Sequence, residues 1–214
     1  IKKIPLLKVR KNLRIEKDLK IFHLINLKKK LVNQIYFELM KNLNEKGYSV
    51  WAMDWAGQGG SQHEIIDTNR AINNFNYDYL DLRDFITDVV NNDKGPIIIL
   101  AHSMGAHIAL RLIAEEANIV DGAILNSPMV TIDTGAFPHG LSTILARLLA
   151  SVGFGWWYAP GNAAWEYNPY YVSGDNKNTS DLNRGVWKEN WRLKEPHTRK
   201  SYGVTFEWLQ NYAQ

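Results

Sequence analysis

The chain has 214 residues, of which 45% are hydrophobic and 22% are charged, a balance that is typical of a globular protein. It contains no cysteine, which excludes a disulfide framework, a thiolate nucleophile and a cysteine-based metal site. No apolar run approaches the ~18 to 20 residues that a membrane-spanning helix needs. Residues 1–7 are too short in their apolar part for a signal peptide.

The positive charge is concentrated near the N-terminal end. Residues 1–46 carry 13 Lys and Arg against 4 Asp and Glu, whereas residues 47–214 carry 12 against 18. Two interpretations stay open: this basic end contacts anionic lipid headgroups, with roughly 1 kcal/mol for each cation, or it is a solvated lysine-rich surface. Nucleic-acid binding is not expected, because no aromatic-basic interleaving accompanies the charge. We expect a cytoplasmic protein, with peripheral contact to the inner membrane as a hypothesis for the basic end.

Strand and helix patterns alternate through the first part of the chain. In chain order, we expect a strand over 19–25, a helix over 35–46, a buried strand over 48–53, a Gly-rich loop over 54–62, a helix over 79–90, a strand over 97–101, a helix over 104–116 and a strand over 122–126. Such alternation implies βαβ units, and right-handed crossovers then place helices on both faces of a mostly parallel sheet. The predicted fold class is α/β, with ligands at the carboxyl ends of the strands.

The pattern changes after Pro128. Apolar residues at helical spacing predict an amphipathic helix over 141–152, and several tryptophans follow in a stretch that glycine and proline punctuate. The segments 182–191 and 202–212 are interpreted as helical or irregular. We therefore expect residues 129–214 to form a mostly helical cap over the sheet.

The most informative motif is Ala101-His102-Ser103-Met104-Gly105, which lies between an apolar, β-branched run and a helical pattern. This context is typical of a nucleophile elbow. Ser103 then stands on a sharp, strained turn that exposes its hydroxyl, and small residues nearby let strand and helix approach closely. The turn also directs the backbone N–H of Met104 toward a developing oxyanion. The alternative is an ordinary βα turn that carries a surface serine.

Several segments together resemble α/β-hydrolases of the monoglyceride lipase and serine aminopeptidase-like group, and bacterial lysophospholipases most of all. The sequence D-W-A-G-Q-G-G-S at 54–61 resembles the family's D-x-R-G-x-G-x-S loop, and L-A-H-S-M-G at 100–105 resembles its elbow. The remaining matches are N-S-P-M at 126–129 with the turn after the next strand, F-N-Y-D-Y at 75–79, and Y-G-V-T-F-E-W at 202–208 with the exit from the cap.

The resemblance implies an α/β-hydrolase fold with a helical cap. It implies a serine hydrolase of lipid carboxylic esters, a lysophospholipase or monoacylglycerol lipase, that works through an acyl-enzyme on Ser103. The backbone N–H of Met104 would be an oxyanion donor, and Ala101, His102 and Gly105 would support the elbow. The implied partner is a small lipid ester, with no cofactor and no metal. The apolar residues of the cap would shelter an acyl chain, or would simply pack the cap.

Two departures from the family pattern bear on activity. The acid and histidine of the triad follow the last strands in this fold, and the sequence ends at Gln214 without such strands. Asp175 or Asp181 followed by His197 has the right chain order, although none of them follows a predicted strand. Residues 25–33 stand where the family carries a Gly-containing oxyanion loop, and they contain no glycine.

These departures lead to an expectation of a C-terminally incomplete or decayed copy that lacks the last strands of the sheet. The predicted organisation is a basic, poorly matching segment over 1–34, an α/β-hydrolase core over 35–128 and a helical cap region over 129–214. The alternative function is a non-catalytic remnant that binds a lipid or a protein partner. A third hypothesis is a membrane-surface protein whose basic segment dominates.

Overall fold

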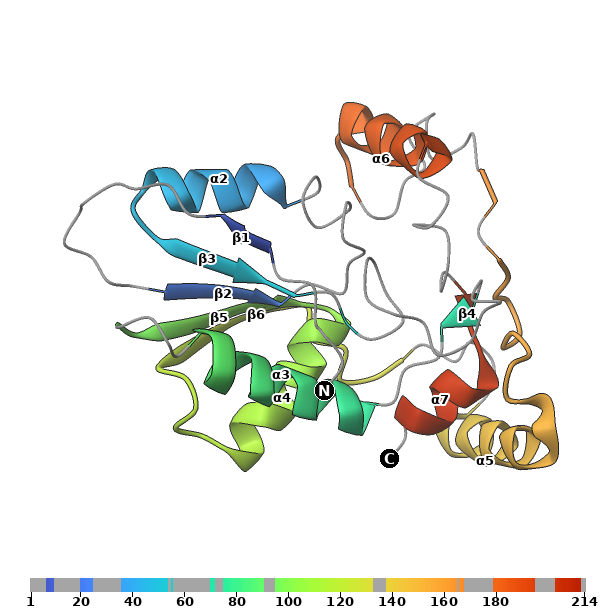
Figure 1. Ribbon diagram of the computed structural model, residues 1–214. Coiled ribbons are helices and arrows are strands. Elements are labelled where there is room, and N and C mark those ends of the chain that lie inside the picture. Colours follow the sequence, from blue (N-terminus) through green and yellow to red (C-terminus); the bar gives the residue numbers. More distant parts are fainter. Residues whose placement is uncertain are drawn as a thin grey trace. The chain divides into compact units, whose positions relative to one another are not determined.

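The computed structural model describes residues 7–9, 20–24, 36–53, 55, 70–71, 75–90, 95–132, 138–164, 166–167, 179–194 and 203–212. The chain forms two compact units (Figure 1). The first unit comprises residues 1–62 and 73–142, and the second comprises residues 63–72 and 143–214. The predicted division at residues 34 and 128 stays a prediction.

The first unit is built on a five-stranded sheet with the strand order β1-β3-β2-β5-β6. Its strands are β1 (Leu7–Val9), β2 (Lys20–Leu24), β3 (Ser49–Ala52), β5 (Ile97–His102) and β6 (Gly122–Asn126). All neighbours are parallel except β1, which pairs antiparallel with β3. The mostly parallel sheet is therefore confirmed. The added β1 is a short strand of three residues that the sequence pattern did not predict.

Helices cover both faces of this sheet, as the alternating pattern predicted. They are α2 (Phe37–Glu45), α3 (Phe75–Phe85), which continues into the π-helical turn η1 (Ile86–Val90), and α4 (Met104–Glu115). Helix α2 lies on one face, while α3 and α4 lie together on the other (Figure 1). Helix α3 begins four residues before the predicted helix over 79–90, because Phe75 packs into the core ahead of exposed Asn76 and Tyr77.

The core beneath α3 and α4 is centred on β5. Alternate side chains of this strand, those of Ile97, Ile99 and Ala101, are buried, in keeping with the two-residue repeat of a strand. Helix α4 presents four fully buried side chains, Ala106, Ile108, Ala109 and Leu112. On the other face, Met40 of α2 packs against Val50 and Ala52 of β3. Burial of these apolar side chains is the main favourable contribution to the folding of this unit.

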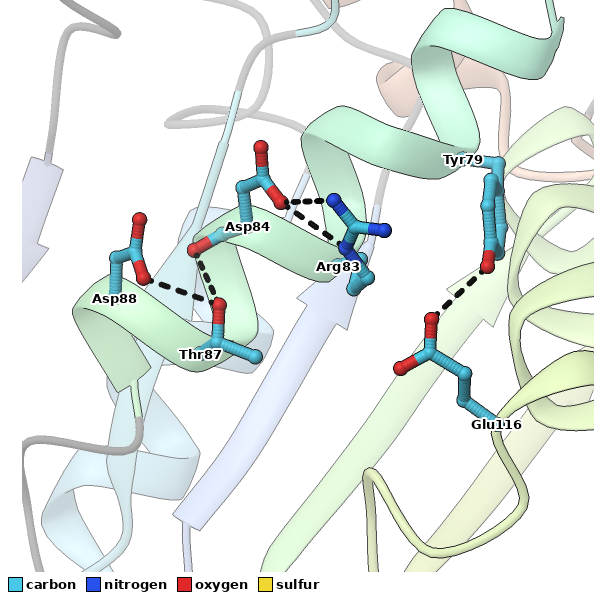
Figure 2. Close-up of polar contacts among 6 residues, drawn as sticks. All are labelled: Tyr79, Arg83, Asp84, Thr87, Asp88 and Glu116. Carbon is cyan, nitrogen blue, oxygen red and sulfur yellow. Dashed lines mark hydrogen bonds and ion pairs between the residues drawn. The ribbon is translucent and has the colours of Figure 1, made fainter.

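Polar contacts join α3 to α4 at the rim of this core. The Tyr79 hydroxyl donates to Oε1 of Glu116 at 2.9 Å, as Figure 2 shows, and this bond raises the pKa of Tyr79. Arg111 of α4 donates to Oδ1 of Asn76 at 2.7 Å. Along α3 and η1, the exposed groups of Arg83, Asp84, Thr87 and Asp88 bond to one another (Figure 2). Exposed bonds of this kind contribute little to the stability of the fold.

The second unit is mostly helical in its described residues. Its elements are β4 (Arg70–Ala71), α5 (His139–Leu149, which crosses the boundary between the units), the π-helical turn η2 (Ala150–Phe154), α6 (Leu182–Lys194), β7 (Gly203–Val204) and α7 (Phe206–Tyr212). Strands β4 and β7 pair in parallel, and neither was predicted from the sequence. A small core joins Ala146, Ala159 and Phe206. The helical character expected for this region is confirmed, and its placement over the sheet stays a prediction.

Gly203 is required by a close approach within the second unit. A Cβ atom at this position would lie 2.6 Å from Cε1 of Tyr158 and would also collide with the carbonyl oxygen of Ala163. This approach lets Ala159 donate its N–H to the carbonyl of Val204 at 2.9 Å. The glycine of the segment 202–208 therefore has a packing reason, since any side chain would push these two segments apart.

None of the helices within the described ranges combines the length and the apolar content that crossing a membrane requires.

Replacing Leu112 by alanine is expected to lower the free energy of unfolding by about 2–5 kcal/mol, because a fully buried side chain would leave a cavity. Urea titration followed by circular dichroism measures this change. Leu110 is the matched control, since it lies in the same helix but is 38% exposed; its alanine variant is expected to change stability by less than about 0.5 kcal/mol. Equal losses for the two variants would contradict the burial of Leu112 on the inner face of α4.

Candidate active site

Ser103 lies on the turn between β5 and α4, outside the regular geometry of either element. Its backbone has φ 56° and ψ −120°, a conformation that residues with a Cβ rarely adopt. Such a residue stores roughly 1–3 kcal/mol of strain, which the surrounding structure must overcome. The turn lies at the carboxyl end of β5, which is the edge of a parallel sheet where ligands bind.

Small and buried residues on both sides make this sharp turn sterically feasible. Ala101 is 1% exposed near the end of β5, and half-buried His102 is the last residue of that strand. Met104, 2% exposed, opens α4, and buried Gly105 follows it. With little side-chain volume at positions 101 and 105, α4 begins directly against the strand that precedes it.

Three backbone hydrogen bonds hold the turn in place. The N–H of Ser103 donates to the carbonyl of Asn126 at 3.1 Å, which joins the turn to the end of β6. The carbonyl of Ser103 accepts from two amides, the N–H of His107 at 3.1 Å and the N–H of Met129 at 3.2 Å. Ser103 is therefore tied to α4 and to the segment that follows β6.

That segment has an unusual backbone of its own. Ser127 has φ 46°, the second positive φ of a non-glycine residue in the described part of the chain. Its hydroxyl lies 3.4 Å from Oδ1 of Asn126. The sequence indicated this segment only through the N-S-P-M match. Its contact with the Ser103 turn depends on tertiary packing, which no local pattern encodes.

His107 is the titratable group that lies nearest to this network on α4. Its half-buried ring packs edge-on against Phe75, with ring centroids 5.5 Å apart and an interplanar angle of 76°. Burial lowers its pKa, a hydrogen bond to the backbone of Met129 opposes that shift, and the positive charge of Arg111 lowers the pKa further. The imidazole is therefore held mainly in its neutral form.

Asp181, which has a predicted catalytic role, makes a local contact at the start of α6. Oδ1 of Asp181 accepts from the N–H of Arg184 at 3.2 Å, so this carboxylate caps the start of α6. Asp175 and His197 lie outside the described residues, as do the segment 25–33 and the loop 54–61 apart from Trp55. Among the described residues, no hydrogen bond joins the Ser103 hydroxyl to an imidazole or a carboxylate.

The family of the chain follows from its sequence. Residues 33–194 match the family described as "Serine aminopeptidase, S33". The chain therefore belongs to this family of hydrolases, and the resemblance drawn from its motifs is confirmed.

Curated relatives of this chain are lipid-ester hydrolases by name. The chain is 29% identical over 181 residues to lysophospholipase L2 of Escherichia coli K12, a match that covers 82% of this chain and 51% of that protein. It is 30% identical over 118 residues to a monoglyceride lipase homolog of Monkeypox virus, covering 55% of this chain and 40% of that protein. The chain thus spans about half the length, or less, of the curated relatives it matches.

Solved structures confirm the α/β-hydrolase fold. A soluble variant of monoglyceride lipase from Saccharomyces cerevisiae, solved with a substrate analog, matches with a TM-score of 0.65 at 18% identity, covering 97% of this chain and 62% of that one. The monoacylglycerol lipase of Paleococcus ferrophilus matches with a TM-score of 0.61 at 15% identity, covering 97% and 68%. At these identities the likeness concerns the fold alone.

The strained turn makes a prediction that does not depend on activity. At a positive φ, glycine is free of the clash that a Cβ suffers, so Ser103→Gly is expected to be more stable than Ser103→Ala by roughly 1 kcal/mol. In a regular helix the order would be reversed, since glycine there costs about 1 kcal/mol relative to alanine. Chemical denaturation of the two variants measures the difference. A more stable alanine variant would contradict a positive φ at this position.

Proposed function

We propose that this protein is a serine hydrolase of lipid carboxylic esters, with Ser103 as the nucleophile of an acyl-enzyme. The observation that carries the proposal is the backbone of Ser103, which has φ 56° between the end of a parallel strand and the start of a helix. An ordinary βα turn has no need of such a strained residue, whereas a nucleophile elbow does. The relatives named as a lysophospholipase and a monoglyceride lipase homolog support the choice of substrate class.

The proposed reaction proceeds in two steps. Oγ of Ser103 attacks the ester carbonyl carbon, the bond to the alcohol oxygen breaks, and the alcohol departs with the proton that the serine hydroxyl gave up. Water then attacks the acyl-enzyme, which releases the fatty acid and returns the proton to Oγ. Met104 follows the nucleophile as the first residue of α4, and the nucleophile-elbow pattern gives its backbone N–H the role of binding the oxyanion of each intermediate.

A general base must take the proton of the hydroxyl. The family pattern implies a histidine that an aspartate or glutamate orients, and the described residues hold no such pair against Ser103. We therefore place no residue of the described structure in this role. His107 is not given this role, because its ring bonds to the backbone of Met129 and packs against Phe75, and no hydrogen bond in the described structure joins the ring to the Ser103 hydroxyl.

Apolar side chains on α5 and after it support a lipid substrate. They share one face at helical spacing or follow the helix closely, and their exposed fractions are 54% for Leu141, 64% for Ile144, 58% for Leu148, 58% for Val152, 46% for Trp156 and 45% for Trp157. Exposed apolar surface of this extent is uncommon unless it binds something. We propose that it contacts the acyl chain.

The basic segment over residues 1–34 completes the proposal. Peripheral contact of its cations with an anionic inner-membrane surface would bring a cytoplasmic enzyme to its lipid substrate. Most of these residues lie outside the described structure, so the support for this contact is the charge pattern alone.

Labelling with a fluorophosphonate tests the nucleophile. We expect the probe to modify Ser103 in the folded chain, and we expect Ser103→Ala to reduce ester hydrolysis by a factor on the order of 10⁵ to 10⁶. Intact-mass and peptide mass spectrometry identify the modified residue. Ser151→Ala is the matched control, because Ser151 is exposed and its hydroxyl only donates to the carbonyl of Leu148 at 2.8 Å. A folded wild-type chain that takes no label would favour the non-catalytic lipid-binding alternative.

Substrate class is tested with glycerol monoesters and lysophospholipids that carry butanoyl, octanoyl or dodecanoyl chains, with an aminoacyl anilide for comparison. We expect kcat/KM to rise with chain length, by up to about fourfold for each buried methylene, and the anilide to react slowly. Ile144→Ser is expected to flatten this dependence. Leu182→Ser is expected to leave it unchanged, because Leu182 lies on α6; this leucine is also exposed, at 50% against 64% for Ile144. Preference for the anilide would overturn the assignment of lipid esters.

A further inference from the structure

We propose that His107 is a positioning residue, whose imidazole ties the segment after β6 to the Ser103 turn and so holds the nucleophile in register. The inference rests on the proposed function of Ser103. It concerns a side chain that does not touch the reacting atoms and acts only through the backbone of Met129.

The three residues form a closed circuit of hydrogen bonds. The carbonyl of Ser103 accepts from the N–H of His107 at 3.1 Å and from the N–H of Met129 at 3.2 Å. The ring of His107 is bonded in turn to the backbone of Met129. His107 therefore bonds to the Ser103 turn through its own backbone N–H. Its side chain also bonds to Met129, the other residue that bonds to the Ser103 carbonyl, so the three residues are linked in a ring.

The direction of the ring's hydrogen bond follows from its effect. The bond with the Met129 backbone raises the pKa of His107, as a bond donated by the ring does, whereas a bond accepted by the ring would lower it. The imidazole therefore donates to the carbonyl oxygen of Met129. Phe75 packs edge-on against the ring and limits its rotation, so the donor stays aimed at that carbonyl.

This circuit restrains a residue that is under strain. The backbone of Ser103, with φ 56°, is strained. If its carbonyl loses one of its two hydrogen-bond donors, relaxation of this backbone releases the strain energy. Without the imidazole, the carbonyl of Met129 loses its hydrogen bond from the ring, and the backbone at Met129 can move away. The N–H of Met129 then no longer bonds to the carbonyl of Ser103. A displacement of about 1 Å at a nucleophile is enough to slow a reaction by about 100-fold.

Three variants separate this role from a merely structural one. His107→Phe keeps an aromatic ring against Phe75 but removes the donor, whereas His107→Gln keeps an N–H donor on a side chain of similar reach. Leu110→Ala is the control, since it changes an exposed position of the same helix. Thermal melts establish that each variant is folded before the two measurements that follow.

The first measurement is hydrogen exchange of the Met129 amide in the full chain, which needs no activity. We expect the amide to exchange about fivefold to tenfold faster in His107→Phe, and to exchange at the wild-type rate in His107→Gln and Leu110→Ala. Unchanged exchange in a folded His107→Phe variant would overturn the proposal, whether or not Ser103 proves to be catalytic.

The second measurement is the rate constant of fluorophosphonate labelling at Ser103, with kcat and KM for an octanoyl ester. We expect His107→Phe to lower the labelling rate and kcat by between about tenfold and about 100-fold with KM little changed, and His107→Gln to recover most of that loss. Equal rates in the wild type and in folded His107→Phe would overturn the positioning role. A wild-type chain that takes no label while its Met129 amide responds as expected would instead contradict only the proposed function.

Discussion

The geometry of this protein's candidate site depends on one carbonyl group, that of Ser103. It accepts from the N–H of His107 and from the N–H of Met129, and so joins the first turn of α4 to the segment after β6. A backbone with a positive φ at a residue that carries a Cβ persists only where several interactions oppose its relaxation. These bonds, together with the one from the Ser103 N–H to Asn126, are such interactions. They convert the fold of the first unit into a defined position for one hydroxyl.

Packing makes that arrangement possible in the first place. The buried small residues Ala101, Gly105 and Ala106 let α4 start directly against β5, and the contacts of α4 with β5 on one side and with α3 on the other hold this helix in place. The chemistry proposed for Ser103 therefore depends on the small side-chain volume of its neighbours as much as on its hydrogen bonds. A larger side chain at any of the three positions would displace the helix and with it the amide of Met104.

The sequence predicted those features that depend on local patterns. The β-branched run over 97–101 and the helical periodicity after Ser103 were enough to locate the turn, and the matching segments were enough to identify the family. The short strands β1, β4 and β7 were missed because two or three residues show no periodicity, and a distant partner decides whether they pair. The contact between His107 and Met129 was missed for the same reason. The acid and base of the triad stay predictions, because nothing in the described residues tests them.

The pairing of β4 with β7 has a consequence for how the chain folds as it is made. Arg70 pairs with Gly203, so the first of these two strands has no partner until the roughly 130 residues between them have left the ribosome. At about 5–20 residues per second, that delay is on the order of ten seconds. All of the strands β2, β3, β5 and β6 have been synthesised well before Gly203, so the sheet of the first unit can form before β4 and β7 pair. The second unit is thus a late-closing part of the molecule.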